Sequence, residues 1–293
     1  MLVFLLFVLG LAVGSFLNVL IDRIPQGQSP FKGRSYCDKC KKTLKWYDMI
    51  PVLSFLILKG KCRYCRTHIS FYYPLVEFIT GVMFVIVFAY VYGLRSTDYG
   101  LSFSILNSPF GLAQGGQFST FLYYLFILPS FIVIFFTDLK YGIIPDKIVY
   151  PSVVIFTIYH LSILPSASLR AGNFPFGLAQ GGQFSIFNYL LSGIGAFIFF
   201  LVLFLITKGK GMGFGDVKLA FLLGLFLGFP KILAALYLAF LTGALIGSIL
   251  IIWRKKKLKG GTIPFGPFLI IGTVLSLFFG EKILRLASLW LSF

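Results

Sequence analysis

The chain has 293 residues, of which 58% are hydrophobic and only 12% are charged. Soluble globular domains carry about a quarter charged residues, so this composition excludes an ordinary soluble domain and indicates a polytopic membrane protein. The formal net charge of +17 does not favour nucleic-acid binding, because the basic residues cluster in short connections between apolar runs and form no single stripe. We therefore expect membrane lipid around the chain and no nucleic acid.

Eight apolar runs predict an all-α polytopic membrane protein with about eight transmembrane helices. Most runs approach the roughly 20 residues that cross a hydrocarbon layer. The run 217–229 is short, but it is retained because an even number of crossings must separate the basic segments 209–218 and 253–260 if both lie inside. The first run lacks a basic start and a small-residue cleavage site, which indicates a retained span rather than a signal peptide. The runs are residues 1–20, 73–92, 121–137, 147–164, 187–207, 217–229, 231–252 and 267–289.

The distribution of lysine and arginine predicts the orientation. With the N-terminus outside, 21 of the 26 basic residues fall in the inner segments, which are 21–72, 138–147, 208–218 and 253–260. Positive charge is retained on the cytoplasmic side of membranes, so this asymmetry predicts that orientation. We expect a first transmembrane helix over 1–20, a cytoplasmic loop domain over 21–72 and a transmembrane domain over 73–293.

The loop 21–72 contains all four cysteines of the chain, as the pairs CDKC and CRYC. Two C-x-x-C pairs separated by 21 residues are typical of a tetrahedral Zn²⁺ site with four thiolates. Disulfides are the competing interpretation, but the predicted cytoplasmic position disfavours them. A shell of four sulfurs is closed, so the metal would be structural rather than catalytic. The predicted ligands are Cys37, Cys40, Cys62 and Cys65.

Only nine acidic residues are present, and several of them lie at the boundaries of the apolar runs. Acids at such boundaries are functional candidates because their ionisation is costly there. Glu77 falls just inside the second run, and Asp146 opens the fourth, where a helix-capping role is an equal alternative. Asp138 and Asp216 stand at the cytoplasmic ends of separate runs and could converge, so capping is the weaker interpretation for this pair.

Two carboxyl groups within hydrogen-bonding distance do not both ionise easily. One keeps a proton while the other acts as a base toward a water molecule, which then attacks a peptide carbonyl. Asp138 and Asp216 are therefore the candidate catalytic pair of an aspartic protease. Glycines at 209, 211, 213 and 215 would let a substrate backbone approach Asp216 without a clash with Cβ.

Six stretches together resemble the prepilin peptidases, the type IV leader peptidases of the G-x-G-D class of membrane aspartyl proteases. They occur in the order of that family and span nearly the whole chain. They are GSFLNVLIDRIP (14–25), the paired C-x-x-C loop, YYPLVEFITG (72–81), DLKYGIIPD (138–146), GFGDVKLA (213–220) and IPFGPFLIIG (263–272).

The resemblance implies that Asp138 and Asp216 cut the basic leader from type IV prepilins and type II secretion pseudopilins, on the cytoplasmic side of the bacterial inner membrane. It also implies N-methylation of the new N-terminal residue with S-adenosylmethionine. Residues expected at the substrate approach or in support are Gly213, Gly215, Lys218, Asp146 and Glu77.

A proton-relaying transporter or channel is the alternative function, because it would also place acids in broken membrane helices. It would not explain the cysteine loop or the acids at one face.

The stretch PFGLAQGGQFS occurs identically at 109–119 and 175–185, and we interpret it as a short element duplicated into outer loops that tolerate insertion.

Overall fold

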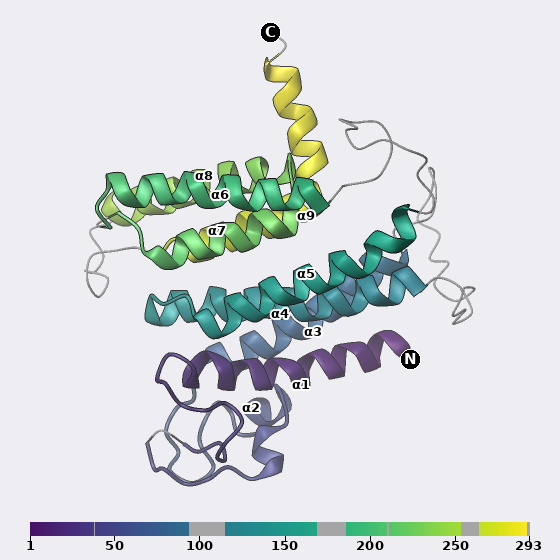
Figure 1. Ribbon diagram of the computed structural model, residues 1–293. Helices are drawn as coiled ribbons and strands as arrows, with labels where there is room; N and C mark the ends of the chain where they lie inside the picture. Colours follow the sequence, from purple (N-terminus) through teal and green to yellow (C-terminus); the bar gives the residue numbers. More distant parts are fainter. Residues whose placement is uncertain (38, 94–114, 169–185, 210, 253–263, 292–293) are drawn as a thin grey trace. The chain divides into compact units, whose positions relative to one another are not determined.

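The computed structural model describes residues 1–37, 39–93, 115–168, 186–209, 211–252 and 264–291, and these are helical except for short connections and the loop after the first helix (Figure 1). The prediction of an all-α membrane protein is confirmed: the described residues contain no strand, only two isolated β-bridges. They form two compact units, Met1–Val133 and Ile134–Phe293, which are described separately below.

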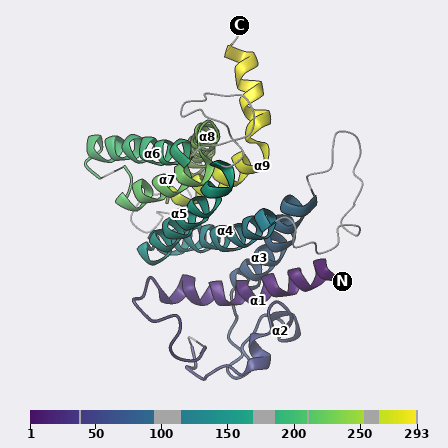
Figure 2. The same cartoon turned by 45° about the vertical axis from the view of Figure 1, so that its right-hand side comes forward.

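In the first unit, α1 (Leu2–Arg23) and α3 (Tyr72–Phe88) lie side by side in both views (Figures 1 and 2). Glycines make this close approach possible. A Cβ added at Gly14 would lie 2.6 Å from the Cα atom of Glu77, and one added at Gly10 would lie 2.7 Å from the Cα atom of Gly81. The α1–α3 contact therefore fixes the position of Glu77 against α1.

The loop between α1 and α3 contains two short helical segments, η1 (Trp46–Met49) and α2 (Leu53–Ile57). The side chain of Arg63 ties the loop together, because its Nε atom lies 2.6 Å from Oδ1 of Asp48. The side chain of Asp48 is only 3% exposed, so this ion pair is partly shielded from water. It links the second cysteine pair to η1.

Helix α4 (Gly115–Tyr141) continues from the first unit into the second. It starts six residues earlier than the run 121–137 predicts, because polar and small residues such as Gln117 and Ser119 extend the helix beyond the apolar run. The end of the first PFGLAQGGQFS copy is thus helical rather than loop. The remainder of that copy and the whole second copy lie outside the described residues.

The second unit is built around α7 (Phe214–Leu227), which contacts each of the other helices that begin in this unit. Its residues from Leu222 to Leu227 are all buried. Figures 1 and 2 show α6 beside α7, in agreement with their extensive contact. The surrounding helices are α5 (Asp146–Ser168), α6 (Ile186–Ile206), α8 (Lys231–Ile252) and α9 (Gly266–Leu291).

Each of the eight apolar runs coincides with one of the long helices. Five helical stretches within the described residues are long and apolar enough to cross a membrane, namely Leu2–Arg23, Tyr72–Tyr92, Phe118–Tyr141, Phe187–Ile206 and Lys231–Ile249. Helix α7 has 14 residues and is the shortest of the eight, as the run 217–229 predicts. The count of eight crossings stays a prediction, and so does the division at residues 20 and 72.

Candidate functional site

Two buried carboxyl groups lie at helix ends within the second unit. Asp138 is in the last turn of α4 and is 5% exposed, and Asp216 is in the first turn of α7 and is 7% exposed. The two side chains are near enough for their charges to interact. The structure therefore brings together the two aspartates that the sequence analysis pairs, although they are 78 positions apart in the chain.

Asp138 is held by the first residue of α9. The backbone N–H of Gly266 donates a hydrogen bond to Oδ2 of Asp138, with an N–O distance of 3.0 Å. A Cβ atom at position 266 would lie 2.5 Å from the same oxygen, so only glycine allows this approach. Helix N-termini present free N–H groups that stabilise negative charge, which suits a carboxyl placed here.

Asp216 is held by its own helix terminus. Its Oδ2 atom accepts a hydrogen bond from the backbone N–H of Gly213, the N-cap of α7, at 3.1 Å. Asp216 therefore does cap its helix, which is the weaker of the two interpretations of this residue from the sequence. The cap uses one carboxyl oxygen, and the described residues offer no other hydrogen bond to this side chain beyond it.

Ile144 lies against both Gly215 and Gly266. A Cβ atom added at Gly215 would lie 3.1 Å from Cβ of Ile144, and one added at Gly266 would lie 3.4 Å from its Cδ1. This apolar side chain therefore contributes to the apolar surroundings of the two carboxyls. The result is a pair of carboxyls, each with one oxygen fixed by a backbone amide, in surroundings that exclude most water. Acid–base activation of a water molecule requires one ionised and one protonated carboxyl, and a pair of interacting buried carboxyls favours that combination.

Gly213 and Gly215 differ in how much space surrounds them. Around Gly215 the side chain of Ile144 leaves little room for a Cβ atom. At Gly213 the nearest atoms to an added Cβ lie 3.8 Å away, which is ordinary contact, and its φ of −81° suits any residue. The structure therefore gives a steric reason for glycine at 215 but none at 213.

Asp146 and Lys218 form a bidentate ion pair across the second unit. The Nζ atom of Lys218 lies 2.8 Å and 2.9 Å from the two carboxylate oxygens of Asp146. Asp146 is the first residue of α5, and Lys218 follows Asp216 by two positions in α7. The ion pair thus joins the start of α7 to the start of α5 close to the aspartate pair.

Glu77 lies in the first unit, where it supports the loop between α1 and α3. Its Oε2 atom accepts a hydrogen bond from the backbone N–H of Val52 at 2.7 Å. Val52 has φ = 58°, a left-handed conformation that is rare for a β-branched residue. The carboxyl of Glu77 therefore holds an unfavourable backbone conformation in place.

We predict that Glu77→Ala destabilises this part of the loop by about 1–3 kcal/mol, because it leaves the partly buried N–H of Val52 without its acceptor. Amide hydrogen exchange of residues 50–58 in detergent-purified protein measures the effect. Glu77→Gln is the matched control, since its amide oxygen keeps an acceptor in the same place. Unchanged exchange in the alanine variant contradicts the proposed support.

The four cysteines of the loop form one cluster. Their sulfur atoms all lie within 4.8 Å of one another, and Sγ of Cys37 lies 3.8 Å from Sγ of Cys65. All four are free thiols, so the structure contains none of the disulfides that the sequence leaves as an alternative. The cluster could hold a metal ion.

The two cysteine pairs adopt the same backbone turn. In the first, the N–H of Lys41 donates to the carbonyl of Cys37, and in the second, the N–H of Arg66 donates to the carbonyl of Cys62. Lys41 and Arg66 occupy equivalent positions and both have positive φ, at 58° and 57°. Two matching turns that face one another present four sulfurs to a single point, as a shared ion requires.

Several supporting residues have no clear signal in the sequence. Gly266 stands in a quoted stretch, IPFGPFLIIG, but nothing in the sequence connects it to Asp138, 128 positions away. Ile144 and Val52 are apolar residues among many. The one available signal is Pro267 directly after Gly266, because proline favours the first turn of a helix and so marks a helix N-terminus.

The fold and the site define a multi-pass helical membrane protein with a buried pair of carboxyls and a four-cysteine cluster. Comparison with known proteins extends this. Residues 8–91 match the bacterial peptidase A24 N-terminal domain, and residues 125–248 match the type IV leader peptidase family. No solved structure matches the chain.

Curated relatives align along nearly the full length of the chain. A protein of Bacillus subtilis (strain 168) is 30% identical over 96% of this chain and 95% of its own. A protein of Neisseria gonorrhoeae is 30% identical over 97% of this chain and 93% of its own, and one of Aeromonas salmonicida is 30% identical over 96% and 92%. Each is named prepilin leader peptidase/N-methyltransferase. The chain belongs to the type IV leader peptidase family.

Proposed function

We propose that the protein is a membrane aspartic endopeptidase that removes the basic leader from type IV prepilins and pseudopilins and N-methylates the new N-terminal residue. The observation that carries the peptidase assignment is the buried pair Asp138 and Asp216, each with one carboxyl oxygen fixed by a backbone amide. The names of the aligned relatives support the substrate class and the methyl transfer.

In the proposed reaction, one aspartate is ionised and removes a proton from water, while the other is protonated and donates to the oxygen of the scissile carbonyl. The amides of Gly266 and Gly213 each occupy one oxygen, which leaves the other oxygen of each carboxyl for water or substrate. Because both amides belong to helix starts, the geometry of the pair is set before substrate binds.

The cytoplasmic side is the proposed place of cleavage, in the inner membrane of a bacterium and with the N-terminus of the enzyme outside. Two contacts support a common face: Asp138 to Gly266 joins the end of α4 to the start of α9, and Asp146 to Lys218 joins the starts of α5 and α7. These helix ends border the basic segments that should remain inside. The basic leader of a prepilin should remain on the cytoplasmic side for the same reason.

A structural zinc ion is the proposed occupant of the cysteine cluster. Tetrahedral Zn²⁺ with Zn–S bonds of about 2.3 Å places its sulfurs roughly 3.8 Å apart. The distance from Sγ of Cys37 to Sγ of Cys65 has this value and is far longer than a disulfide bond of about 2 Å. The ion would cross-link Cys37 and Cys40 to Cys62 and Cys65 and so stabilise the loop.

We predict about one zinc per chain in purified protein, measured by elemental analysis, and loss of that zinc in Cys62→Ser. The loop should then unfold at a lower temperature, because metal binding contributes folding free energy. His68→Ala is the matched control, since His68 is exposed beside the cluster and should leave the metal content unchanged. A full zinc content in Cys62→Ser contradicts the site.

S-adenosylmethionine is the proposed methyl donor, by similarity to the relatives. The stretch GKGMGFGDVK does not supply a dinucleotide-binding loop for it: Asp216 stands where a third glycine is needed, and its carboxyl caps α7. The described residues assign no set of ligands to the methyl donor.

The function is tested by reconstitution of the purified protein in vesicles with a leader-bearing prepilin. Mass spectrometry should show loss of the leader, and a further methyl group when S-adenosylmethionine is added. Ion flux through the same vesicles tests the alternative of a proton-relaying transporter or channel. Flux without cleavage would contradict the peptidase, whereas cleavage without methylation would contradict only the second activity.

A further inference from the structure

An apolar segment lies within the loop that otherwise carries much of the positive charge of the chain. Residues 49–58, MIPVLSFLIL, contain Ser54 as their single polar side chain. Hydrophobic side chains of this segment are exposed, although water is an unfavourable environment for them. The exposed side chains and their exposed fractions are Met49 40%, Leu53 51%, Leu56 64% and Ile57 66%.

Several backbone N–H groups of this segment have acceptors within the protein. The N–H groups of Ser54, Leu56 and Leu58 donate to carbonyls of the segment itself. The N–H of Val52, which cannot reach such a carbonyl, donates to the buried carboxyl of Glu77. Non-helical backbone is tolerated at membrane depth only where its polar groups have protein partners, and these four N–H groups have them.

The position of the segment along α3 places it beside the membrane-spanning part of the protein. Glu77 is the sixth residue of α3, about 7–8 Å along the helix axis from Tyr72. The ring of Phe55 contacts that of Phe71, which is 68% exposed at the start of α3. The exposed apolar surface of the segment is thus continuous with the apolar surface of a transmembrane helix.

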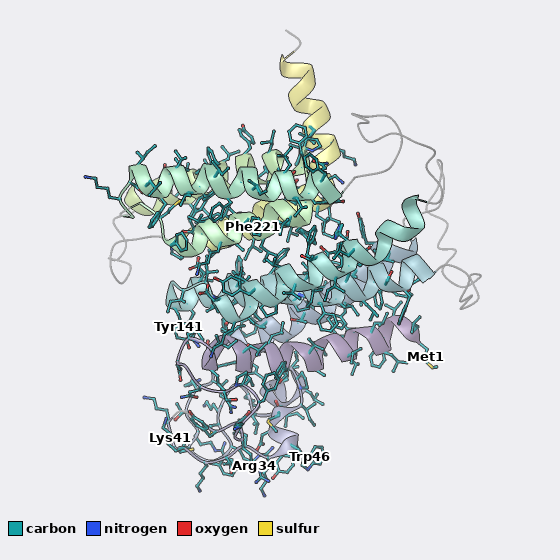
Figure 3. The ribbon with its side chains drawn as sticks, viewed as in Figure 1. Met1, Arg34, Lys41, Trp46, Tyr141 and Phe221 are labelled. Carbon is teal, nitrogen blue, oxygen red and sulfur yellow. The ribbon has the colours of Figure 1, made fainter. Side chains whose placement is uncertain are left out.

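The residues around the segment suit the boundary between headgroups and acyl chains. Trp46, which is 75% exposed, precedes it, and Lys45 and Lys59 flank it. Tryptophan is enriched at this boundary, and lysine is attracted to anionic headgroups. Figure 3 shows Trp46 on the side of the loop toward the N-terminal part of α1, whereas Lys41 lies toward the C-terminal end of α1.

We propose that residues 49–58 are immersed in the cytoplasmic leaflet and that its lipid is the partner of this surface. The cysteine turns remain in water, and the Arg63–Asp48 ion pair connects them to the immersed part. One side of the loop therefore lies within the membrane surface, and the loop as a whole is not surrounded by water. This inference rests on the orientation given in the proposed function, concerns the first unit alone and does not depend on the peptidase activity.

Tryptophan fluorescence in vesicles tests the proposal. The full chain, with Trp46, Trp253 and Trp290 replaced by phenylalanine, receives either Leu56→Trp or the control Thr43→Trp, at an exposed position of the first cysteine turn. Vesicles contain equal parts of phosphatidylglycerol and of phosphatidylcholine brominated in its acyl chains. Bromine quenches only indole rings that lie among the chains, so the Leu56→Trp protein should lose more than half of its emission and the control little.

Equally weak quenching of the two proteins, with the metal content of the wild type, overturns the proposal, since it means that water, another protein or a second copy covers the segment. A second measurement avoids the case of a misfolded variant. Trp253→Phe with Trp290→Phe leaves Trp46 in an unaltered loop, and lipid brominated near the headgroup should quench it. Absence of that quenching also overturns the proposal.

Discussion

Asp138→Asn and Asp216→Asn should each reduce prepilin cleavage by at least about 1,000-fold, which corresponds to about 4 kcal/mol of transition-state stabilisation. The reaction needs one carboxyl that is ionised and one that is protonated, and an amide can take neither part. The fold should survive both changes. The asparagine side-chain oxygen can still accept the N–H of Gly266 at position 138 and that of Gly213 at position 216.

The measurement is the rate of leader removal by purified enzyme with a prepilin substrate in vesicles. Asp146→Asn is the matched control, because it removes a carboxyl at the same face that is half exposed and paired with Lys218. We expect that variant to lose about tenfold or less, as for a supporting charge at the surface. Cleavage by Asp138→Asn or Asp216→Asn at a rate near that of the wild type would show that the catalytic pair is wrongly assigned.

Gly266→Ala should reduce cleavage by about 100-fold or more while the protein remains folded. The new Cβ atom would lie 2.5 Å from Oδ2 of Asp138 and 3.2 Å from its Cγ, so the carboxyl must turn away. This movement is inexpensive for folding, because the displaced atoms are the end of a side chain. It is expensive for catalysis, because a displacement of about 1 Å in a reacting group costs about 100-fold.

Gly195 provides the control for this substitution. A Cβ atom at Gly195 would meet nothing within 4 Å, so Gly195→Ala should keep activity and gain about 0.5–1 kcal/mol of stability in its helix. The thermal unfolding midpoint and kcat of each variant are measured together. Loss of kcat in proportion to loss of folded protein would mean that Gly266 serves the fold and not Asp138.

The sequence is informative about features that depend on neighbouring residues. Hydropathy is local, so the apolar runs match the helices to within a few residues at most ends, and the short run 217–229 corresponds to α7. The C-x-x-C spacing likewise places two sulfurs together within each turn. Convergence of the two turns into one cluster is expected because a single tetrahedral zinc ion binds four thiolates.

Features that depend on packing between distant segments are not visible in the sequence. The hydrogen bond from Gly266 to Asp138 joins residues 128 positions apart, and the pairing of Asp146 with Lys218 spans 72 positions. Each contact depends on the rotation of one helix against another, which hydropathy does not encode. For the same reason the support of Val52 by Glu77 could be recognised only in the structure.

The shortness of α7 has a consequence for the supply of water to the reaction. Fourteen residues of helix are about 21 Å long, whereas a hydrocarbon layer is about 30 Å thick. A crossing by this helix requires the bilayer to thin around it or the headgroup region to reach down to one of its ends. Asp216 occupies the first turn of that helix. Hydrolysis consumes one water molecule per bond, and the diffusion path from the cytoplasm to the carboxyls is shortest where the apolar barrier is thinnest.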